Sequence, residues 1–167
     1  MKTNLVRKVC KQDITTFCLL CTVALFLDSY IIKFMYEIRV EDHFAAAHFL
    51  QDYHGKCESL HGHNYKVYAH VRGKTLDDGG MLLDFSLLKK AVQKACDILD
   101  HTNLNDLKNS DGSLVFLNNP SAERIAQWIF IQVQNDLKQE NRLTNDTKLY
   151  AVDVFETEFN RARYIAN

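Results

Sequence analysis

Five of the seven histidines fall between His43 and His63, and His61 and His63 are separated only by a glycine. Residues two apart on a strand point to the same face, about 6 to 7 Å apart, so both imidazoles can reach one metal ion. His48 ends the preceding extended segment and can supply a third nitrogen from a neighbouring strand. Three neutral imidazoles with one open position are typical of a catalytic zinc site, whereas an isolated His-x-His is often only a surface pair. Three of the other histidines lack such a partner and are expected on the surface or in the sheet: His43, His54 and His70.

Cys57 lies four residues before His61, in a predicted loop. It can be a fourth metal ligand, which would close the site and make it structural. It can also be a free thiol beside the metal, with its thiolate favoured by nearby cations. The residue types and spacing leave both roles open.

Asp100 and His101 directly follow a predicted helix. A carboxylate beside a histidine can orient the imidazole and raise its basicity, which suits proton transfer near neutral pH. A histidine at the end of a helix is also favoured by the helix dipole alone. The pair is therefore either a proton-transfer group or a helix terminus.

Hydrophobic periodicity predicts the elements that position these residues. Residues 36–47 are extended, and residues 61–72 alternate, with Tyr65, Val67, Ala69 and Val71 on one face. Residues 85–99 have helical spacing after the cap residue Asp84. The apolar stripe of this helix is predicted to contain Leu88, Ala91, Val92, Ala95, Ile98 and Leu99. This order of elements indicates an α+β domain with an antiparallel sheet and helices on one face.

A second helix is predicted after Pro120 and Ser121, with an apolar stripe of Ile125, Ala126, Ile129, Val133 and Leu137. Glu123 lies in its first turn, where favourable interaction with the helix dipole is the simplest role for a carboxylate. A last strand is predicted over residues 148–159. Its alternation assigns one face to Tyr150, Val152, Val154 and Glu156.

The composition is that of a globular protein: 167 residues, 47% hydrophobic and 25% charged, with one proline and six glycines. The net charge of -1, with no block of like charges, argues against a nucleic-acid partner.

Five cysteines are present, of which only Cys57 and Cys96 lie beyond residue 34. That number gives no disulfide framework, so we expect a reducing compartment, the cytoplasm. Cys96 lies in an apolar helix stripe and is expected to be a small buried hydrophobe.

Residues 1–34 form an apolar leader that is distinct from the domain predicted over residues 35–167. Four basic residues precede an uncharged run over residues 14–27, a pattern typical of a signal peptide. The run is short for a membrane span and is followed by no clear cleavage site. We favour a translation start at Met35, and a membrane anchor or export signal is the alternative.

Several motifs occur together in one order: Phe44-Ala45-Ala46-Ala47-His48, Cys57-Glu58-Ser59-Leu60-His61-Gly62-His63-Asn64-Tyr65, Leu99-Asp100-His101, Asn119-Pro120-Ser121-Ala122-Glu123 and Phe155-Glu156-Thr157. From about Met35 to the C-terminal end, the chain thereby resembles the 6-pyruvoyltetrahydropterin synthase family. The short C-x-x-x-H-G-H spacing looks most like the bacterial branch, the 6-carboxy-5,6,7,8-tetrahydropterin synthases of queuosine biosynthesis.

The resemblance implies specific roles for the candidate residues. His48, His61 and His63 would hold one zinc ion per subunit, with Cys57 as the catalytic thiol rather than a ligand. Asp100 and His101 would form a second proton-transfer pair.

The resemblance also implies substrate-binding residues. Glu156 would anchor the pterin ring, because a carboxylate offers paired acceptors. Ser121 and Glu123 match positions near the pterin pocket. Phe49 stands where the family often has arginine, so a triphosphate contact from that position is lost.

The resemblance also implies the T-fold, a four-stranded antiparallel sheet with two helices on one face, whose subunit sheets join into a barrel. A homohexamer with active sites between subunits is the usual assembly. The expected reaction converts 7,8-dihydroneopterin triphosphate to 6-carboxy-5,6,7,8-tetrahydropterin, acetaldehyde and triphosphate. The alternatives are the pyruvoyl-forming synthase reaction and a non-catalytic, zinc-stabilised module.

Overall fold

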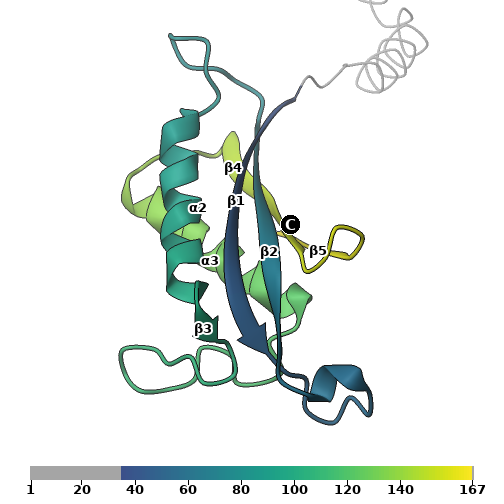
Figure 1. The fold of residues 1–167 in the computed structure, drawn as a ribbon. Coiled ribbons are helices and arrows are strands. Elements are labelled where there is room, and N and C mark those ends of the chain that lie inside the picture. The colour runs from purple at the N-terminus through teal and green to yellow at the C-terminus, as the bar shows by residue number, and fades with distance from the viewer. Residues whose placement is uncertain (1–34, 167) are drawn as a thin grey trace, which may run out of the picture. The chain divides into compact units, whose positions relative to one another are not determined.

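The computed structural model describes residues 35–166, which form one five-stranded sheet and two α-helices (Figure 1). The leader predicted over residues 1–34 lies outside the described residues, as does the last residue of the chain. Within the described part, no helix is long and apolar enough to cross a membrane.

The sheet has the spatial order β3-β1-β2-β4-β5. Its four longer strands pair antiparallel, and the two-residue β3 pairs parallel with β1 at one edge. A short 3-10 helix, η2, lies in the loop between β1 and β2. The bounds are β1 Tyr36–His48, η2 Lys56–Glu58, β2 His61–Gly73, β3 Thr102–Asn103, β4 Thr147–Phe155 and β5 Arg161–Ile165. The expected α+β class is confirmed, but the described sheet has five strands rather than four.

The prediction of one strand over residues 148–159 is wrong at the C-terminal end. There β4 stops at Phe155, and the chain turns back into β5. The hydroxyl of Thr157 accepts hydrogen bonds from the backbone N–H groups of Phe159 and Asn160. A threonine side chain thus stabilises this turn, which contains no glycine or proline to mark it in the sequence.

The register between β2 and β4 shifts at Tyr150, which is left without a partner because Leu149 and Ala151 pair with consecutive residues of β2. This extra residue is a β-bulge, and it reverses the alternation of faces along β4. Leu149 and Val152 both belong to the core. Tyr150 instead lies against Arg72, whose Cζ atom is 3.4 Å from the centroid of the Tyr150 ring. The predicted placement of Tyr150 on the same face as Val152 is therefore wrong.

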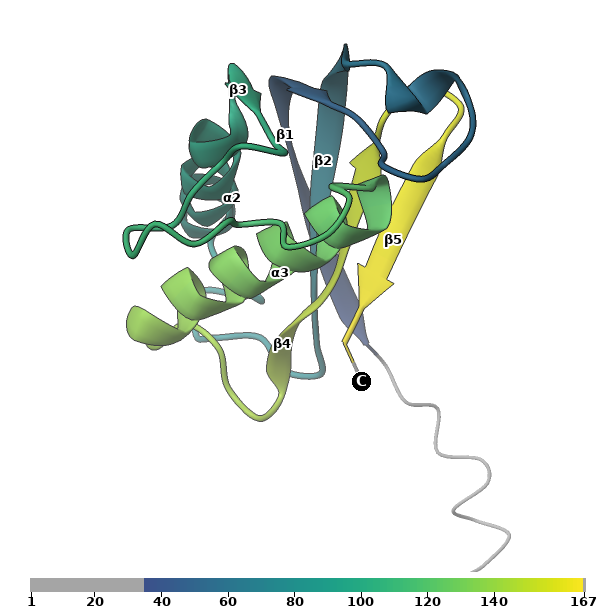
Figure 2. The ribbon, with the colours of Figure 1, turned by 90° about the horizontal axis from the view of Figure 1, so that it is seen from below.

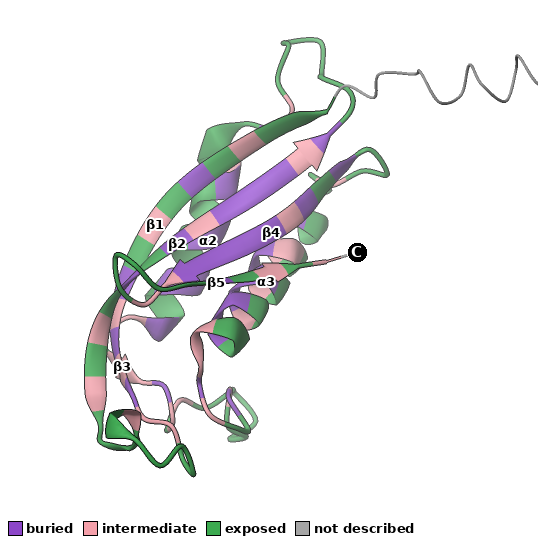
Figure 3. Ribbon diagram, turned by 90° about the vertical axis from the view of Figure 1, so that its right-hand side faces the viewer, coloured by how far each residue is buried: buried purple, intermediate pink, exposed green. Residues whose placement is uncertain are grey.

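Both helices cover the same face of the sheet (Figure 2). Helix α2 (Phe85–Leu99) packs on β1, and α3 (Ala122–Gln139) packs on β4 and β5. The Asp84 side chain caps α2 by accepting a hydrogen bond from the backbone N–H of Ser86 at 2.7 Å. The core between the layers contains the predicted stripe of α3 in full, and in Figure 3 buried residues run along β2 and β4.

The stripe of α2 differs from the prediction at one position. Ile98 lies at the edge of the stripe and is 48% exposed, whereas Cys96 is buried. Burial raises the pKa of the Cys96 thiol well above its usual range, and nearby carboxylates add to this effect. Cys96 is therefore a protonated core residue, as the sequence predicts.

The sheet face opposite the helices carries a network of ionisable groups, in which His70 and Asp153 are buried. The ring nitrogens of His70 lie 2.9 Å from a carboxylate oxygen of Glu37 and 2.8 Å from one of Asp153. Arg163 donates two hydrogen bonds of 2.7 Å to the Asp153 carboxylate. This network connects β1, β2, β4 and β5.

Candidate active site

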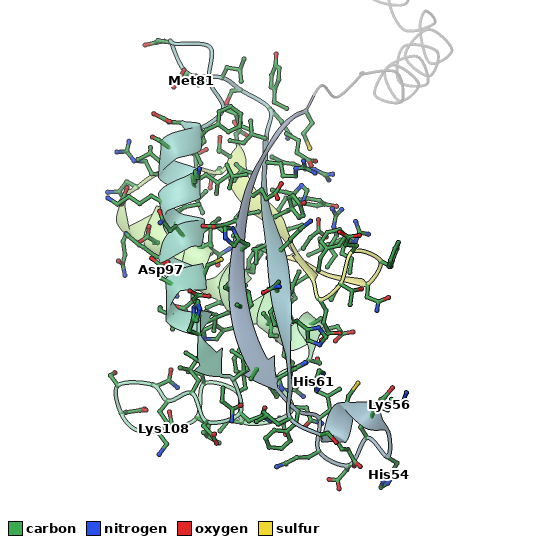
Figure 4. The ribbon with its side chains drawn as sticks, viewed as in Figure 1. His54, Lys56, His61, Met81, Asp97 and Lys108 are labelled. Carbon is green, nitrogen blue, oxygen red and sulfur yellow. The ribbon has the colours of Figure 1, made fainter. Side chains whose placement is uncertain are left out.

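Three histidines meet where the β1–β2 ladder ends. His48 is the residue directly opposite His61, and Ala46 is opposite His63. Residues that pair across neighbouring strands share a face of the sheet, and so do residues two apart along one strand. All three imidazoles therefore lie on the helix-facing side. One ligand atom from each lies within 4.8 Å of the others. Figure 4 shows His61 at the start of β2, close to η2 with its Lys56.

Backbone carbonyl groups orient two of these rings. The Nδ1 atom of His48 donates to the carbonyl oxygen of Pro120 at 2.9 Å, and that of His61 donates to Ser59 at 2.7 Å. The Nε2 atoms are thereby left as acceptors, the arrangement found around metal-bound histidines. The Nε2 atoms of His48 and His63 are buried, and neither has a hydrogen-bond partner in the described part of the chain. Since a buried polar atom without a partner is unfavourable, the cluster fits a metal ion.

Burial also sets the protonation of the cluster. Burial lowers the pKa values of His48 and His63 below the usual range, and the other imidazoles lower them further. The charge of Glu156, and for His48 the hydrogen bond to Pro120, act in the opposite direction without outweighing burial. Neutral imidazoles are the form that binds a metal ion.

Glu156 lies beside the histidines, immediately after the end of β4. One of its carboxylate oxygens is 3.3 Å from Nε2 of His48 and 3.7 Å from Nε2 of His63. Its backbone N–H donates to the carbonyl oxygen of Asn160 across the turn to β5. The fold thus brings together four of the predicted site residues from three strand ends.

Asp100 and His101 form a fixed pair at the edge of β1. One Asp100 oxygen accepts from the backbone N–H of Ala45 at 2.8 Å, and the other lies 2.7 Å from Nδ1 of His101. These hydrogen bonds hold the pKa of Asp100 below its usual value, that from Ala45 having the larger effect. His101 has a positive φ of 55°, which is strained for a residue other than glycine.

The His101 side chain is 83% exposed. One open hollow is nevertheless lined by residues 45–47, 62–64 and 101–103, and so includes both His63 and His101. The Asp100–His101 pair is therefore held rigidly by the backbone while its imidazole remains accessible. This geometry suits a group that exchanges protons with a bound molecule.

Cys57 is half-buried in η2, between the two histidine-bearing strands, and forms no disulfide with Cys96, the other cysteine that the structure describes. Its carbonyl oxygen accepts a hydrogen bond from Leu50 at 2.8 Å, which ties η2 to the end of β1. Among the described residues, Cys57 does not belong to the group whose ligand atoms lie within 4.8 Å of one another. This geometry favours the free thiol over the fourth ligand.

Ser121 and Glu123 lie at the start of α3 and do not join the histidine cluster directly. Ser121 is the N-cap residue, but its side chain makes no capping hydrogen bond. It lines a separate hollow with residues 50–53. Glu123 is exposed in the first turn, as expected for a carboxylate near a helix N-terminus. The link to the cluster is the adjacent Pro120, whose carbonyl group accepts from His48.

Sequence reasoning missed the groups that surround the ligands. The carbonyl groups of Ser59 and Pro120 act through the backbone, so no side-chain pattern reveals them. The alternation of β2 predicts only that Tyr65 is buried, whereas in the structure its hydroxyl is also left without a partner among the described residues. Burial raises the pKa of Tyr65 far above its usual value, and the charge of Glu156 adds to the effect. A tyrosine two residues after His63 on a core-facing alternation was the available signal.

Comparison with known proteins shows the family of this chain. The family model of 6-pyruvoyl tetrahydropterin synthase matches residues 37–167. The 6-carboxy-5,6,7,8-tetrahydropterin synthase of Synechocystis sp. is 34% identical over 137 residues, which cover 79% of this chain and 95% of the relative. The enzyme of the same name from Bacillus subtilis is 37% identical over 127 residues, which cover 75% of this chain and 80% of the relative.

Among solved structures, that of Caenorhabditis elegans 6-pyruvoyl tetrahydropterin synthase matches with a TM-score of 0.65 and 26% identity. The match covers 80% of this chain and 96% of that chain. The resemblance found in the motifs is thereby confirmed, and so is the T-fold, with the added strand β3. The chain belongs to the 6-pyruvoyl tetrahydropterin synthase family and is a lyase of that family.

Proposed function

We propose that this enzyme converts 7,8-dihydroneopterin triphosphate to 6-carboxy-5,6,7,8-tetrahydropterin, acetaldehyde and triphosphate, a step in queuosine biosynthesis. The observation that carries the proposal is the cluster of three core-facing imidazoles, two with buried and unpartnered Nε2 atoms, beside the Glu156 carboxylate. The names of the relatives from Synechocystis and Bacillus subtilis support the carboxy product.

His48, His61 and His63 would hold one zinc ion per subunit, since three imidazoles leave a position open for substrate. A bound zinc ion supplies Lewis acidity, which lowers the pKa values of the neighbouring hydroxyl groups on the substrate side chain. The hydrogen bonds to Pro120 and Ser59 support this role, because they direct the Nε2 atoms of two ligands inward.

The other residues would bind the pterin and move protons. Glu156 would accept hydrogen bonds from the amino and ring N–H groups of the pterin. The Cys57 thiol and the Asp100–His101 pair would transfer protons to and from the side-chain carbons and oxygens of the substrate. Ser121 and Glu123 would lie near the pterin pocket, at the start of α3.

The proposed assembly is a homohexamer in which subunit sheets join into a barrel. One edge of the sheet consists of β3 and the part of β1 that β3 does not cover, and the other edge is β5. Both edges expose backbone groups that could pair with another copy of the chain. The exposure of His101 supports an active site between subunits. Cys57 and His101 of one chain then need not serve the same active site.

The test is incubation of the zinc-loaded protein with 7,8-dihydroneopterin triphosphate. We expect acetaldehyde and 6-carboxy-5,6,7,8-tetrahydropterin in equal amounts, and loss of both after zinc is removed by a chelator. A protein that binds zinc but turns over no substrate would instead be the non-catalytic, zinc-stabilised module. In that case, removal of zinc should unfold the chain.

The pyruvoyl-forming synthase reaction is the second candidate, because the matching Caenorhabditis elegans structure bears that name. Both reactions would use the same zinc ligands and the same proton-transfer groups. The product mixture distinguishes them, since 6-pyruvoyltetrahydropterin retains the carbons that the carboxy reaction releases as acetaldehyde.

A further inference from the structure

Tyr65 is fully buried beneath the histidine cluster, yet its hydroxyl has no hydrogen-bond partner among residues 35–166. Its ring is held in place by stacking on Phe44, with ring centroids 4.7 Å apart and planes 14° apart. Buried hydroxyl groups nearly always have a partner, because losing hydration without replacing the hydrogen bond is unfavourable. A fixed phenol in this position therefore calls for an acceptor in the working form of the site.

The strand register brings Tyr65 next to Glu156. The last residues paired between β2 and β4 are Lys66 and Phe155, so the next residues on each strand, Tyr65 and Glu156, face each other at the end of the ladder. The Tyr65 ring is also an edge-on neighbour of His48 and His63, with centroids 6.0 Å and 5.5 Å away. These are the two histidines that lie nearest the Glu156 carboxylate.

A metal ion in the cluster changes what Glu156 can bind. The Nε2 atom of His48 has no proton to offer in any case, because the ring proton is on Nδ1 and donates to Pro120. With a metal bound, the Nε2 lone pair of His63 would also point to the metal and would offer no proton to the carboxylate. A carboxylate this close to the ligand atoms can also become a fourth ligand, which would close the open position. Glu156 therefore needs a donor other than the histidines to keep its oxygens directed at a pterin.

We propose that Tyr65 is a positioning residue whose hydroxyl donates a hydrogen bond to the Glu156 carboxylate and directs it toward the N–H groups of the pterin rather than toward the metal. This inference rests on the proposed function, because it assumes that Glu156 binds a pterin. It explains why a buried tyrosine occupies a position on the core face of β2 where phenylalanine would pack equally well.

The test is Tyr65→Phe in the zinc-loaded protein, with binding of 7,8-dihydroneopterin measured by calorimetry. We expect the dissociation constant to rise by about tenfold to a hundredfold, the usual effect of losing a hydrogen bond to a charged group. Zinc content should not change. The melting temperature of the protein without zinc and pterin should stay equal or rise, because in that form the variant removes only an unpartnered hydroxyl. Tyr68→Phe is the matched control, since Tyr68 lies on the same strand, on the opposite face, against Phe155 and Arg39.

A double-mutant cycle with Glu156→Gln identifies the partner of the hydroxyl. If Tyr65 acts through Glu156, Tyr65→Phe should have a much smaller effect on pterin binding when it is combined with Glu156→Gln. A full effect in that combination, or unchanged binding by Tyr65→Phe alone, would overturn the inference and leave the proposed function standing. A wild-type protein that binds no pterin would overturn the proposed function itself.

Discussion

The Nε2 atom of His48 lies 3.3 Å from a carboxylate oxygen of Glu156, joining the end of β1 to the turn that follows β4. His48 is buried and Glu156 is only partly exposed, so this contact forms largely out of water. It places a candidate pterin anchor directly against a candidate metal ligand. Metal binding and pterin binding are therefore expected to share one small volume, although their residues come from distant parts of the sequence.

Glu156→Gln should weaken pterin binding while zinc stays bound. Glutamine has nearly the same size but replaces one of two acceptor oxygens with a donor, which opposes the N–H groups of a pterin. We expect about a tenfold or larger increase in the dissociation constant of 7,8-dihydroneopterin, measured by calorimetry. Glu158→Gln, in the same turn and exposed, is the control. If zinc is lost from Glu156→Gln, then Glu156 is itself a metal ligand.

Replacement of any one of His48, His61 or His63 by alanine should lower the zinc content below one ion per subunit. Each variant removes one of three imidazoles whose ligand atoms lie within 4.8 Å of one another. Metal analysis after dialysis against a buffered zinc concentration measures the effect. His43→Ala is the matched control, because His43 is an exposed histidine on the opposite face of β1. Full occupancy in one of the three variants would remove that residue from the ligand set.

Cys57→Ala should keep its zinc, its fold and its assembly, but form product about 10²–10⁴-fold more slowly. The reason is that three imidazoles already provide the protein's share of an open tetrahedral site, while the thiol transfers protons. Zinc analysis, thermal melting and product formation are measured on the same protein sample.

The opposite result for Cys57→Ala is equally informative. If Cys57 were a fourth ligand, the variant would lose metal affinity and stability together. A variant that loses zinc and melts early would therefore assign Cys57 to the metal site and contradict its proposed role as the thiol in proton transfer.

Asp153→Asn should destabilise the protein at neutral pH by about 3 kcal/mol, because it removes one partner of a buried charge network. Burial by itself raises the pKa of Asp153, but hydrogen bonds from Arg163 and His70 outweigh it and hold the pKa below the usual value of 3.8. A carboxyl group with a lowered native pKa stabilises the fold above its unfolded pKa, and this contribution is lost as the pH falls through the native value.

The stability difference between wild type and Asp153→Asn should therefore be largest above pH 3.8 and shrink as the pH falls further below that value. Denaturant titrations across this range, where the fold persists, measure it. Asp78→Asn, in an exposed turn, is the control and should change stability little at any pH. A difference that stays constant with pH would mean that the Asp153 charge does not carry the effect.

The sequence by itself determined β1, β2, the two α-helices and the candidate chemistry. The alternation of Tyr65, Val67, Ala69 and Val71 predicted the buried face of β2, and all four residues are buried. The helical spacing over residues 85–99 predicted α2 with the observed bounds. These predictions succeed because the period of burial is set locally, by strand and helix geometry. The ordered motifs likewise identified the family before any geometry was known.

Tertiary structure alone decided what those patterns could not encode. The bulge at Tyr150 reverses the faces of β4, since one unpaired residue shifts every later side chain by half a period. The turn that ends β4 depends on the Thr157 hydroxyl rather than on a glycine or proline. The meeting of His48 with Glu156 and of Tyr65 with the histidine cluster follows from strand order and register. Such contacts join residues that are distant in sequence, so only the folded sheet brings them together.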